Sequence, residues 1–178
     1  MKSLEQYIEE SLLDDIDTLS KNADKAIKQE IKQFLKDNFN GASKCKISKN
    51  LNDDGKYVVD CAGDIKVKNR SITSLTNDLF VWGKFDKGFD CSYCDKLTSL
   101  KDAPKEVGGN FYCCYCDSLT SLEGAPKEVG WYFMCHDCSS LTSLEGAPEK
   151  VGGDFNCKGC RSLKSYDINS NIKGKFIK

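Results

Sequence analysis

This sequence has almost no net charge, no long hydrophobic run and a single histidine. Its 178 residues hold 26 Lys and Arg against 27 Asp and Glu, and one His. The formal net charge of −1 gives no global field that would attract nucleic acid or an anionic membrane, so we expect neither as a direct partner. No apolar run approaches the ~20 residues needed to cross a bilayer. The start MKSLEQYIEE lacks the apolar stretch of a secretory signal.

Catalytic signatures are also missing. We find no phosphate-binding glycine loop and no triad of nucleophile, base and acid. The sequence therefore predicts a protein that is not an enzyme, with no catalytic residues and no cofactor.

What the sequence does contain is an internal repeat. Each full copy opens on Leu-Thr-Ser-Leu and ends on Phe-x-Cys-x-x-Cys, and three copies align without a gap. In the truncated last copy Phe176 occupies the place of Phe155. The copies lie at 72–96 (degenerate), 97–118, 119–140, 141–162 and 163–178 (truncated).

The apolar positions of the repeat follow neither a helical period nor a strand alternation throughout. Only the Phe-x-Cys portion alternates, which predicts one very short strand per repeat, with turns elsewhere. A unit this small cannot bury its apolar set alone, so successive units must stack and share a core. The sequence predicts an α+β chain: a helical extension (1–41), a small β-rich cap (42–71) and a solenoid with one short parallel strand per repeat (72–178). In the copy 97–118 the positions expected in the core are Leu97, Leu100, Ala103, Val107, Phe111, Cys113 and Cys116.

The pattern L-T-S-L-x-x-A-P-x-x-V-G-G-x-F-x-C-x-x-C resembles a leucine-rich repeat of bacterial or phage type. Phe111 and Cys113 match the two strand leucines of that family, and Cys116 matches its Asn/Cys position. The resemblance covers residues 64–178. It implies a phage or bacterial protein in the reducing cytoplasm of a bacterial cell, and leaves function open because the solenoid is a generic scaffold.

Eleven cysteines are the strongest feature of the composition. Adjacent C-x-x-C pairs are spaced as in a structural zinc site, and zinc is one interpretation. We favour reduced thiols in the core, because the pairs recur with the repeat and Asn69 stands where Cys160 stands. Disulfides are the third possibility. The C-x-x-C pairs are Cys91 and Cys94, Cys113 and Cys116, Cys135 and Cys138, and Cys157 and Cys160; Cys45 and Cys61 have no assignment.

If Phe and Cys of each strand point inward, the residues between and beside them face outward on the concave sheet. The repeat 119–140 departs from its neighbours at these positions, with large aromatic side chains, a Met and the single His. Alternation also turns Cys114 toward solvent, and we interpret His136 as a surface residue. The alternative is that Trp131 covers a bend and the tyrosines merely cover the sheet. The predicted partner-binding residues are Asp90, Tyr112, Cys114, Tyr115, Trp131, Tyr132, Met134, His136, Asn156 and Lys158.

Two helices are expected in the first 40 residues, one to about Asp15, with a capping box at Ser3 and Gln6, and one over 22–39. Residues 1–19 hold one Lys against six acids, and 20–40 hold five Lys against three acids. This complementarity predicts an antiparallel hairpin. The helices are expected either to cap the solenoid or to dock a partner.

Together these observations predict a non-catalytic protein-binding module, with a protein partner of unknown identity. A phage accessory or anti-defence inhibitor is one form of it. A structural zinc protein and a phage virion component are the alternatives.

Overall fold

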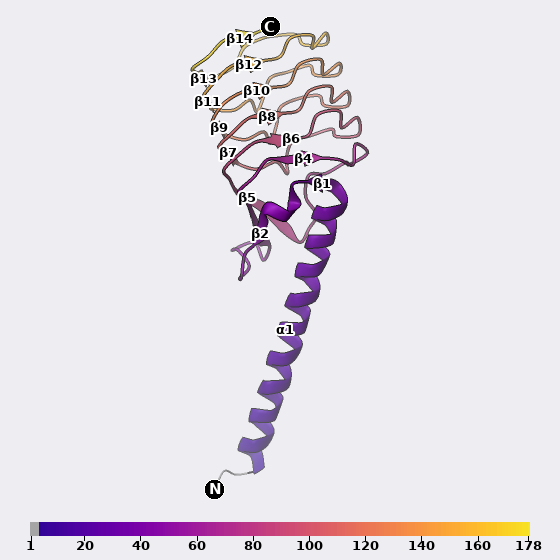
Figure 1. Ribbon diagram of the computed structural model, residues 1–178, viewed down its shortest axis with the longest axis vertical. Coiled ribbons are helices and arrows are strands. Elements are labelled where there is room, and N and C mark those ends of the chain that lie inside the picture. Colours follow the sequence, from indigo (N-terminus) through magenta and orange to yellow (C-terminus); the bar gives the residue numbers. More distant parts are fainter. Residues whose placement is uncertain (1–3) are drawn as a thin grey trace.

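The computed structural model describes residues 4–178, with side chains from residue 6, and shows one long helix followed by a stack of β-solenoid turns (Figure 1). The helix, α1, spans Leu4–Asn38. The capping box expected at Ser3 lies outside the described residues. No described helix is long and apolar enough to cross a membrane.

Each turn of the solenoid contributes a strand to each of two seven-stranded sheets. Sheet A contains β1 (Phe39–Asn40), β4 (Ile65–Val67), β6 (Phe89–Asp90), β8 (Phe111–Tyr112), β10 (Phe133–Met134), β12 (Phe155–Asn156) and β14 (Phe176–Ile177). Sheet B contains β2 (Cys45–Ile47), β3 (Tyr57–Cys61), β5 (Phe80–Phe85), β7 (Glu106–Val107), β9 (Glu128–Val129), β11 (Lys150–Val151) and β13 (Asn171–Ile172). A short 3-10 helix, η1 (Ala42–Lys44), joins β1 to β2.

The predicted helix-plus-solenoid fold is confirmed, with two refinements. Each turn has two strands rather than one, because the Glu-Val or Lys-Val pair before the glycines forms sheet B. The parallel register also begins earlier than the repeats: β3 pairs in parallel with β5, and β4 with β6. Six turns result within residues 4–178, from β3 and β4 through β13 and β14, while β1 and β2 pair antiparallel at the first edge.

Stacking in register builds the core. The ring of Phe111 stacks on those of Phe89 and Phe133, with centroids 5.7 and 5.5 Å apart and planes within 9°. Phe176 pairs in register with Phe155, as the truncated copy predicts. The seven expected core positions of the copy 97–118 are all buried. Burying one such side chain contributes about 1.5–3 kcal/mol, and the stack repeats this at every turn.

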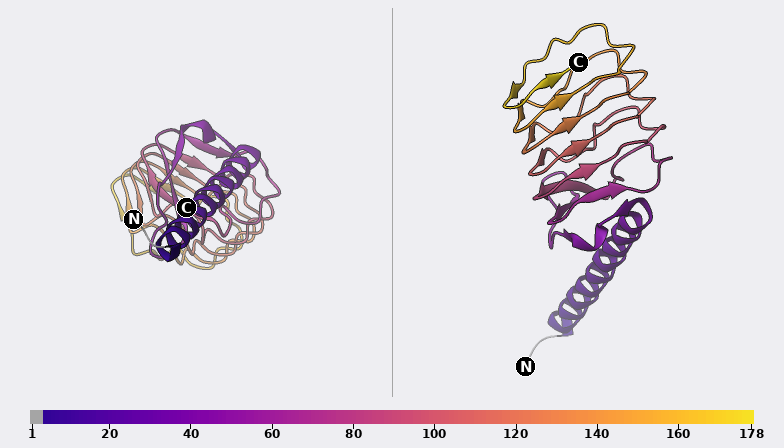
Figure 2. Two further views of the ribbon diagram at one scale, coloured as in Figure 1. Left: turned by 90° about the horizontal axis from the view of Figure 1, so that it is seen from below. Right: turned by 45° about the horizontal axis from the view of Figure 1, so that its top comes forward.

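The C-terminal part of α1 closes the first end of the stack (Figure 2). Ile31 and Leu35 are buried there, and Phe39 packs edge-on against Trp82, 5.3 Å between ring centroids. The Trp82 indole N–H donates to the Leu75 carbonyl at 3.1 Å, so this large ring carries no unpaired polar group into the core. Residues 27–39 therefore act as a cap on the solenoid.

Candidate functional site

Sheet A presents a column of outward side chains. Asp90, Tyr112, Met134 and Asn156 occupy equivalent positions of neighbouring parallel strands, as the repeat predicts. Each is half-buried, next to a fully buried Phe. Lys66 continues the column and its Nζ lies 2.7 Å from an Asp90 carboxylate oxygen. Burial raises the pKa of Tyr112 above its ordinary value, and the negative charge of Asp90 raises it further.

Cys114 does not face solvent, which corrects the sequence prediction. The strand ends at Tyr112, and the turn that follows brings Cys114 inside, where it is 5 % exposed. Its backbone N–H donates to Ser92 Oγ at 3.2 Å, and its thiol donates to the Met134 carbonyl at 3.4 Å. Burial raises the pKa of Cys114 to about 11. A thiol held neutral and covered in this way is not a contact residue.

The equivalent positions in the next turns are more open. The His136 side chain is 29 % exposed, with Nδ1 2.9 Å from Asp137 Oδ2, and Lys158 is exposed. The equivalent positions after the strands of sheet A are therefore not alike. Ser92 and Cys114 are buried, whereas His136 and Lys158 reach the surface.

A ladder of rings runs along the turn that follows sheet A. The second of the two residues between the cysteines of a C-x-x-C pair adopts a left-handed backbone. Its φ is 64° at Tyr93, 55° at Tyr115 and 57° at Asp137. Tyr93 and Tyr115 stack with centroids 4.7 Å apart and planes within 8°, and His136 meets Tyr115 edge-on at 5.1 Å. Arg70 lies over Tyr93, 4.9 Å from the ring centroid.

Sequence reasoning selected Tyr115 for this surface and missed Tyr93 and Arg70. Tyr93 could have been found, because it occupies the same position within its C-x-x-C segment as Tyr115. Arg70 could not, since it lies before the degenerate copy, in a segment where Asn69 stands at the place of the second cysteine and no C-x-x-C pair marks the position.

Trp131 and Tyr132 lie just before strand β10 of sheet A, at the corner that leads from β9 to β10. Their ring centroids are 6.4 Å apart, and the Trp131 side chain is 62 % exposed. The neighbouring copies have glycine at the Trp131 position. The structure therefore separates the predicted cluster into a corner of Trp131 and Tyr132, a column on sheet A, and the ring ladder that holds Tyr115.

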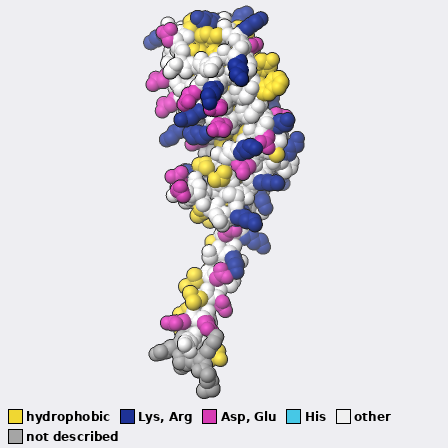
Figure 3. Space-filling view, turned by 90° about the vertical axis from the view of Figure 1, so that its left-hand side faces the viewer, with side chains coloured by type: hydrophobic (Ala, Val, Ile, Leu, Met, Phe, Trp, Pro, Cys, Tyr) yellow, Lys and Arg dark blue, Asp and Glu magenta, His cyan; other side chains and the backbone are white. Residues whose placement is uncertain are grey.

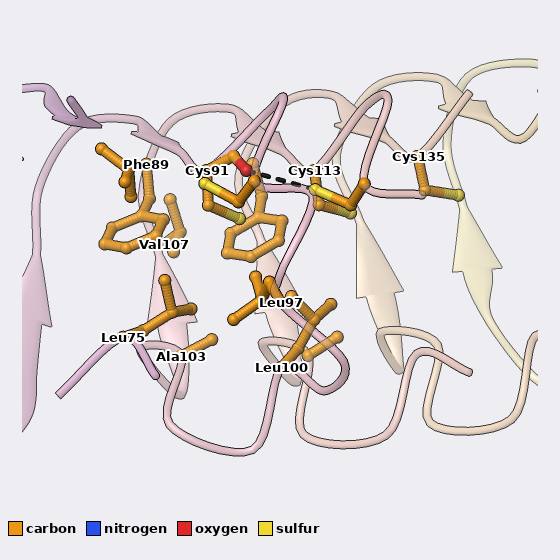
Figure 4. Packing of buried hydrophobic residues seen from close by; sticks show 14 of the residues in the cluster. Leu75, Phe89, Cys91, Leu97, Leu100, Ala103, Val107, Cys113 and Cys135 are labelled. Carbon is orange, nitrogen blue, oxygen red and sulfur yellow. Dashed lines mark hydrogen bonds between the residues drawn. The ribbon is translucent and has the colours of Figure 1, made fainter. Parts of the chain in front are cut away.

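The C-x-x-C cysteines are buried inside the solenoid (Figure 4). The second thiol of a pair donates to the backbone carbonyl of the first cysteine of the preceding turn. Cys116 reaches the Cys91 oxygen in this way at 3.2 Å, and Cys138 the Cys113 oxygen at 3.1 Å. Burial raises the pKa of Cys91 and Cys113 well above the ordinary value, which opposes the thiolate form that a metal would need.

Two further findings concern cysteine and metal chemistry. Cys45 and Cys61, which the sequence left unassigned, face each other across β2 and β3 and form a disulfide. Among the residues that the structure describes, no group of three or more His, Cys, Asp and Glu side chains is arranged to hold a metal ion.

The N-terminal part of α1 projects away from the solenoid (Figure 1). This corrects the two-helix hairpin: residues 4–38 form one continuous helix, because 16–21 hold no Gly or Pro that would interrupt it. All side chains from 6 to 20 are exposed. Its large apolar members are Tyr7, Ile8, Leu12, Leu13, Ile16 and Leu19.

A groove of about 870 Å³ lies between the C-terminal half of α1 and the segment that contains η1 and β2. Leu35, Phe39 and Ile47 are among its apolar lining residues. Six lysines, and no carboxylate of the described part of the chain, also line it, namely Lys28, Lys32, Lys36, Lys46, Lys49 and Lys68. In Figure 3 the far end of the helix shows apolar and acidic side chains, and dark blue Lys and Arg side chains gather where the helix meets the solenoid.

These features define the class of the protein: a β-solenoid of six two-strand turns, capped at its first end by a partly projecting helix. Comparison with models of known protein families, with curated proteins and with solved structures gives no match.

Proposed function

We propose that this protein is a non-catalytic binding module that engages a protein partner through the outer face of sheet A and its Trp131 corner. The observation that carries the proposal is the exposed Trp131 beside Tyr132, in the repeat whose strand also presents Met134 next to Tyr112. Tyr and Trp are the residues most enriched at binding hot spots, because they offer large, rigid contact area.

The edges of this face supply polar contacts. Asp90, Asn156 and Lys158 extend it over the neighbouring turns, and His136 and Tyr115 border it at the turn. The corner at Tyr132 and the ladder at His136 lie on either side of the two-residue strand β10. A partner covering the column from Asp90 to Asn156 would contact several adjacent turns. This is how solenoids bind extended surfaces.

The resemblance of the repeats to bacterial and phage leucine-rich repeats supports a bacterial cell as the place of action. A phage accessory protein that inhibits a host complex is the specific form of the proposal that we would test first. The protein, tagged and expressed during infection, should co-purify with one host complex at constant stoichiometry.

The decisive comparison uses two sets of variants. Tyr112→Ala, Tyr132→Ala and Met134→Ala together should reduce recovery of that complex at least tenfold, since hot-spot truncations each remove about 2 kcal/mol or more. Leu51→Ala with Tyr166→Ala removes exposed apolar side chains outside this face and should leave recovery unchanged. Equal recovery with the triple variant and the wild type would reject sheet A as the binding face.

A further inference from the structure

One face of α1 carries opposite charges in its two halves. An α-helix has 3.6 residues per turn, so residues spaced three and four apart share a face. Along one such face the N-terminal half presents Tyr7, Glu10, Asp14 and Asp17, and the C-terminal half presents Lys25, Lys28 and Lys32, followed on the same face by the buried Leu35. The two halves of a straight helix cannot fold onto each other. The charge complementarity between the halves therefore cannot be satisfied within one helix.

The same charges match when a second helix lies antiparallel with its centre at Lys21. Each residue of one copy then faces a residue of the second copy, and the two residue numbers add up to 42. Glu10 faces Lys32, Asp14 faces Lys28, and Asp17 faces Lys25. Tyr7 faces Leu35, an apolar lining residue of the groove. The helix bounds obey the same rule, since Leu4 and Asn38 also sum to 42, so the two helices overlap along their full length of about 52 Å.

The groove places lysines where the acidic half of such a helix would lie. Lys28 and Lys32 form one of its walls, and the η1 and β2 segment forms the other. Its lining holds six lysines, and the helix half that would enter is rich in acids. We propose that two copies of this chain form an antiparallel pair about α1, with the acidic half of each helix in the lysine-lined groove of the other.

Contacts within one chain compete with the pair. Lys21 bonds Asp17 at 2.5 Å. An exposed pair of this kind contributes about 0.3–0.5 kcal/mol and can exchange for contacts in the pair. Lys28 bonds Asp24 at 3.0 Å, donates to the Lys49 carbonyl at 3.0 Å and lies 5.0 Å from the centroid of the Tyr57 ring, so it would have to exchange more than one contact. The two Lys21 residues meet at the symmetry axis, where each shares its own Asp17 with Lys25 of the second copy. The arrangement is isologous and closes after two copies.

Mass measurement of the full chain by light scattering tests the pair. A dimer of 19.9 kDa subunits is expected to form as the protein concentration approaches ~1 mM at low salt. It should dissociate toward monomer as salt approaches ~1 M, where the Debye length falls to about 3 Å. A monomer at every concentration and salt, or a dimer insensitive to salt, would overturn the proposal.

Charge reversal supplies the sharper arm. Glu10→Lys with Asp17→Lys leaves Asp14 as the only acid of the face, and Lys25→Glu with Lys32→Glu leaves Lys28 as the only lysine of its C-terminal half. Each variant alone should be monomeric, and an equal mixture should form a heterodimer, because both halves then face opposite charges. Rescue by mixing excludes a folding defect as the reason for the loss.

A matched control changes charge elsewhere on the same helix. Asp15→Lys with Glu30→Lys alters the opposite face of α1 and should leave the dimer intact. Two reversed variants that each still dimerise, or a mixture that stays monomeric, would refute this pairing and leave the proposed role of sheet A untouched.

Discussion

The solenoid and the projecting half of α1 are stabilised in opposite ways. In the solenoid, each turn buries Leu, Val, Phe and Cys against identical residues of its neighbours, and polar groups are paired across turns. In residues 6–20 every side chain is exposed, and the helix depends on its own backbone hydrogen bonds and charge pairs. Isolated helices of this length are marginal in water. The comparison separates the part that fixes the fold from the part that is available for contact.

The largest difference is expected from truncating a core ring. Phe111→Ala should lower the free energy of unfolding by about 3–5 kcal/mol, because it leaves a cavity between two stacked rings. Urea unfolding measures this, with Phe111→Leu as the milder control. A loss under about 1 kcal/mol would contradict the stacked column.

The disulfide at the first edge is the next contribution. Cys45 and Cys61 are 16 residues apart, and closing a loop of about this size restricts the unfolded chain by about 3 kcal/mol. Reduction should therefore lower the thermal midpoint of the wild type. The variant with Cys45→Ser and Cys61→Ser should be insensitive to reductant, and an unchanged wild-type midpoint would show that the bond does not stabilise the first edge.

Alkaline pH should weaken the solenoid in a defined window. An unfolded thiol has a pKa near 8.5, whereas burial raises that of Cys114 to about 11. The stabilisation is complete below about pH 8.5 and is lost as pH rises toward 11, by about 1.4 kcal/mol per pH unit for this thiol. Unfolding of Cys114→Ala across this range should show a slope smaller by that amount. Equal slopes would mean that the thiol ionises freely in the folded protein.

The smallest effect is expected in the projecting helix. Leu12→Ala removes a large side chain that contacts solvent and lies off the face proposed for pairing, so the free energy of unfolding should change by less than about 0.5 kcal/mol. Together with Phe111→Ala it forms a matched pair of truncations. A loss typical of a buried leucine, about 2 kcal/mol or more, would mean that the helix is folded against the solenoid.

Metal analysis sharpens the account of the cysteines. The second thiols of three C-x-x-C pairs donate to backbone carbonyls, so protein purified without added metal should contain less than about one zinc per chain. Full occupancy by zinc, lost together with the fold on chelation, would restore the structural zinc interpretation.

Much of the solenoid could be predicted, because the repeat itself determines which residues stack. The positions of Leu97, Val107 and Phe111 recur at the same place in each full copy, and only a stack in register buries all of them. The second strand was missed because two residues such as Glu106 and Val107 carry no alternation. Cys114 was misplaced because alternation was extended beyond the end of a two-residue strand.

The N-terminal region was harder for a different reason. Two helices were expected, one to about Asp15 and one over 22–39, and their opposite charges predicted a hairpin, although helix continuity depends on backbone propensity rather than on charge. The two halves of the helix do carry opposite charges, and we propose that the antiparallel partner of each half belongs to a second chain. The lysine-lined groove combines α1 with residues 39–49 and with Lys68, an arrangement that only the folded chain reveals.

The distance between positions 9 and 33 tests the division between cap and projecting helix most directly. A pair of spectroscopic labels introduced at Glu9 and Gln33, in protein diluted with unlabelled chain, reports the distance within one molecule. A continuous helix predicts about 36 Å, from a rise of about 1.5 Å for each residue between the two positions. A distance of about 10 Å, the separation of packed antiparallel helices, would show a hairpin and contradict the account.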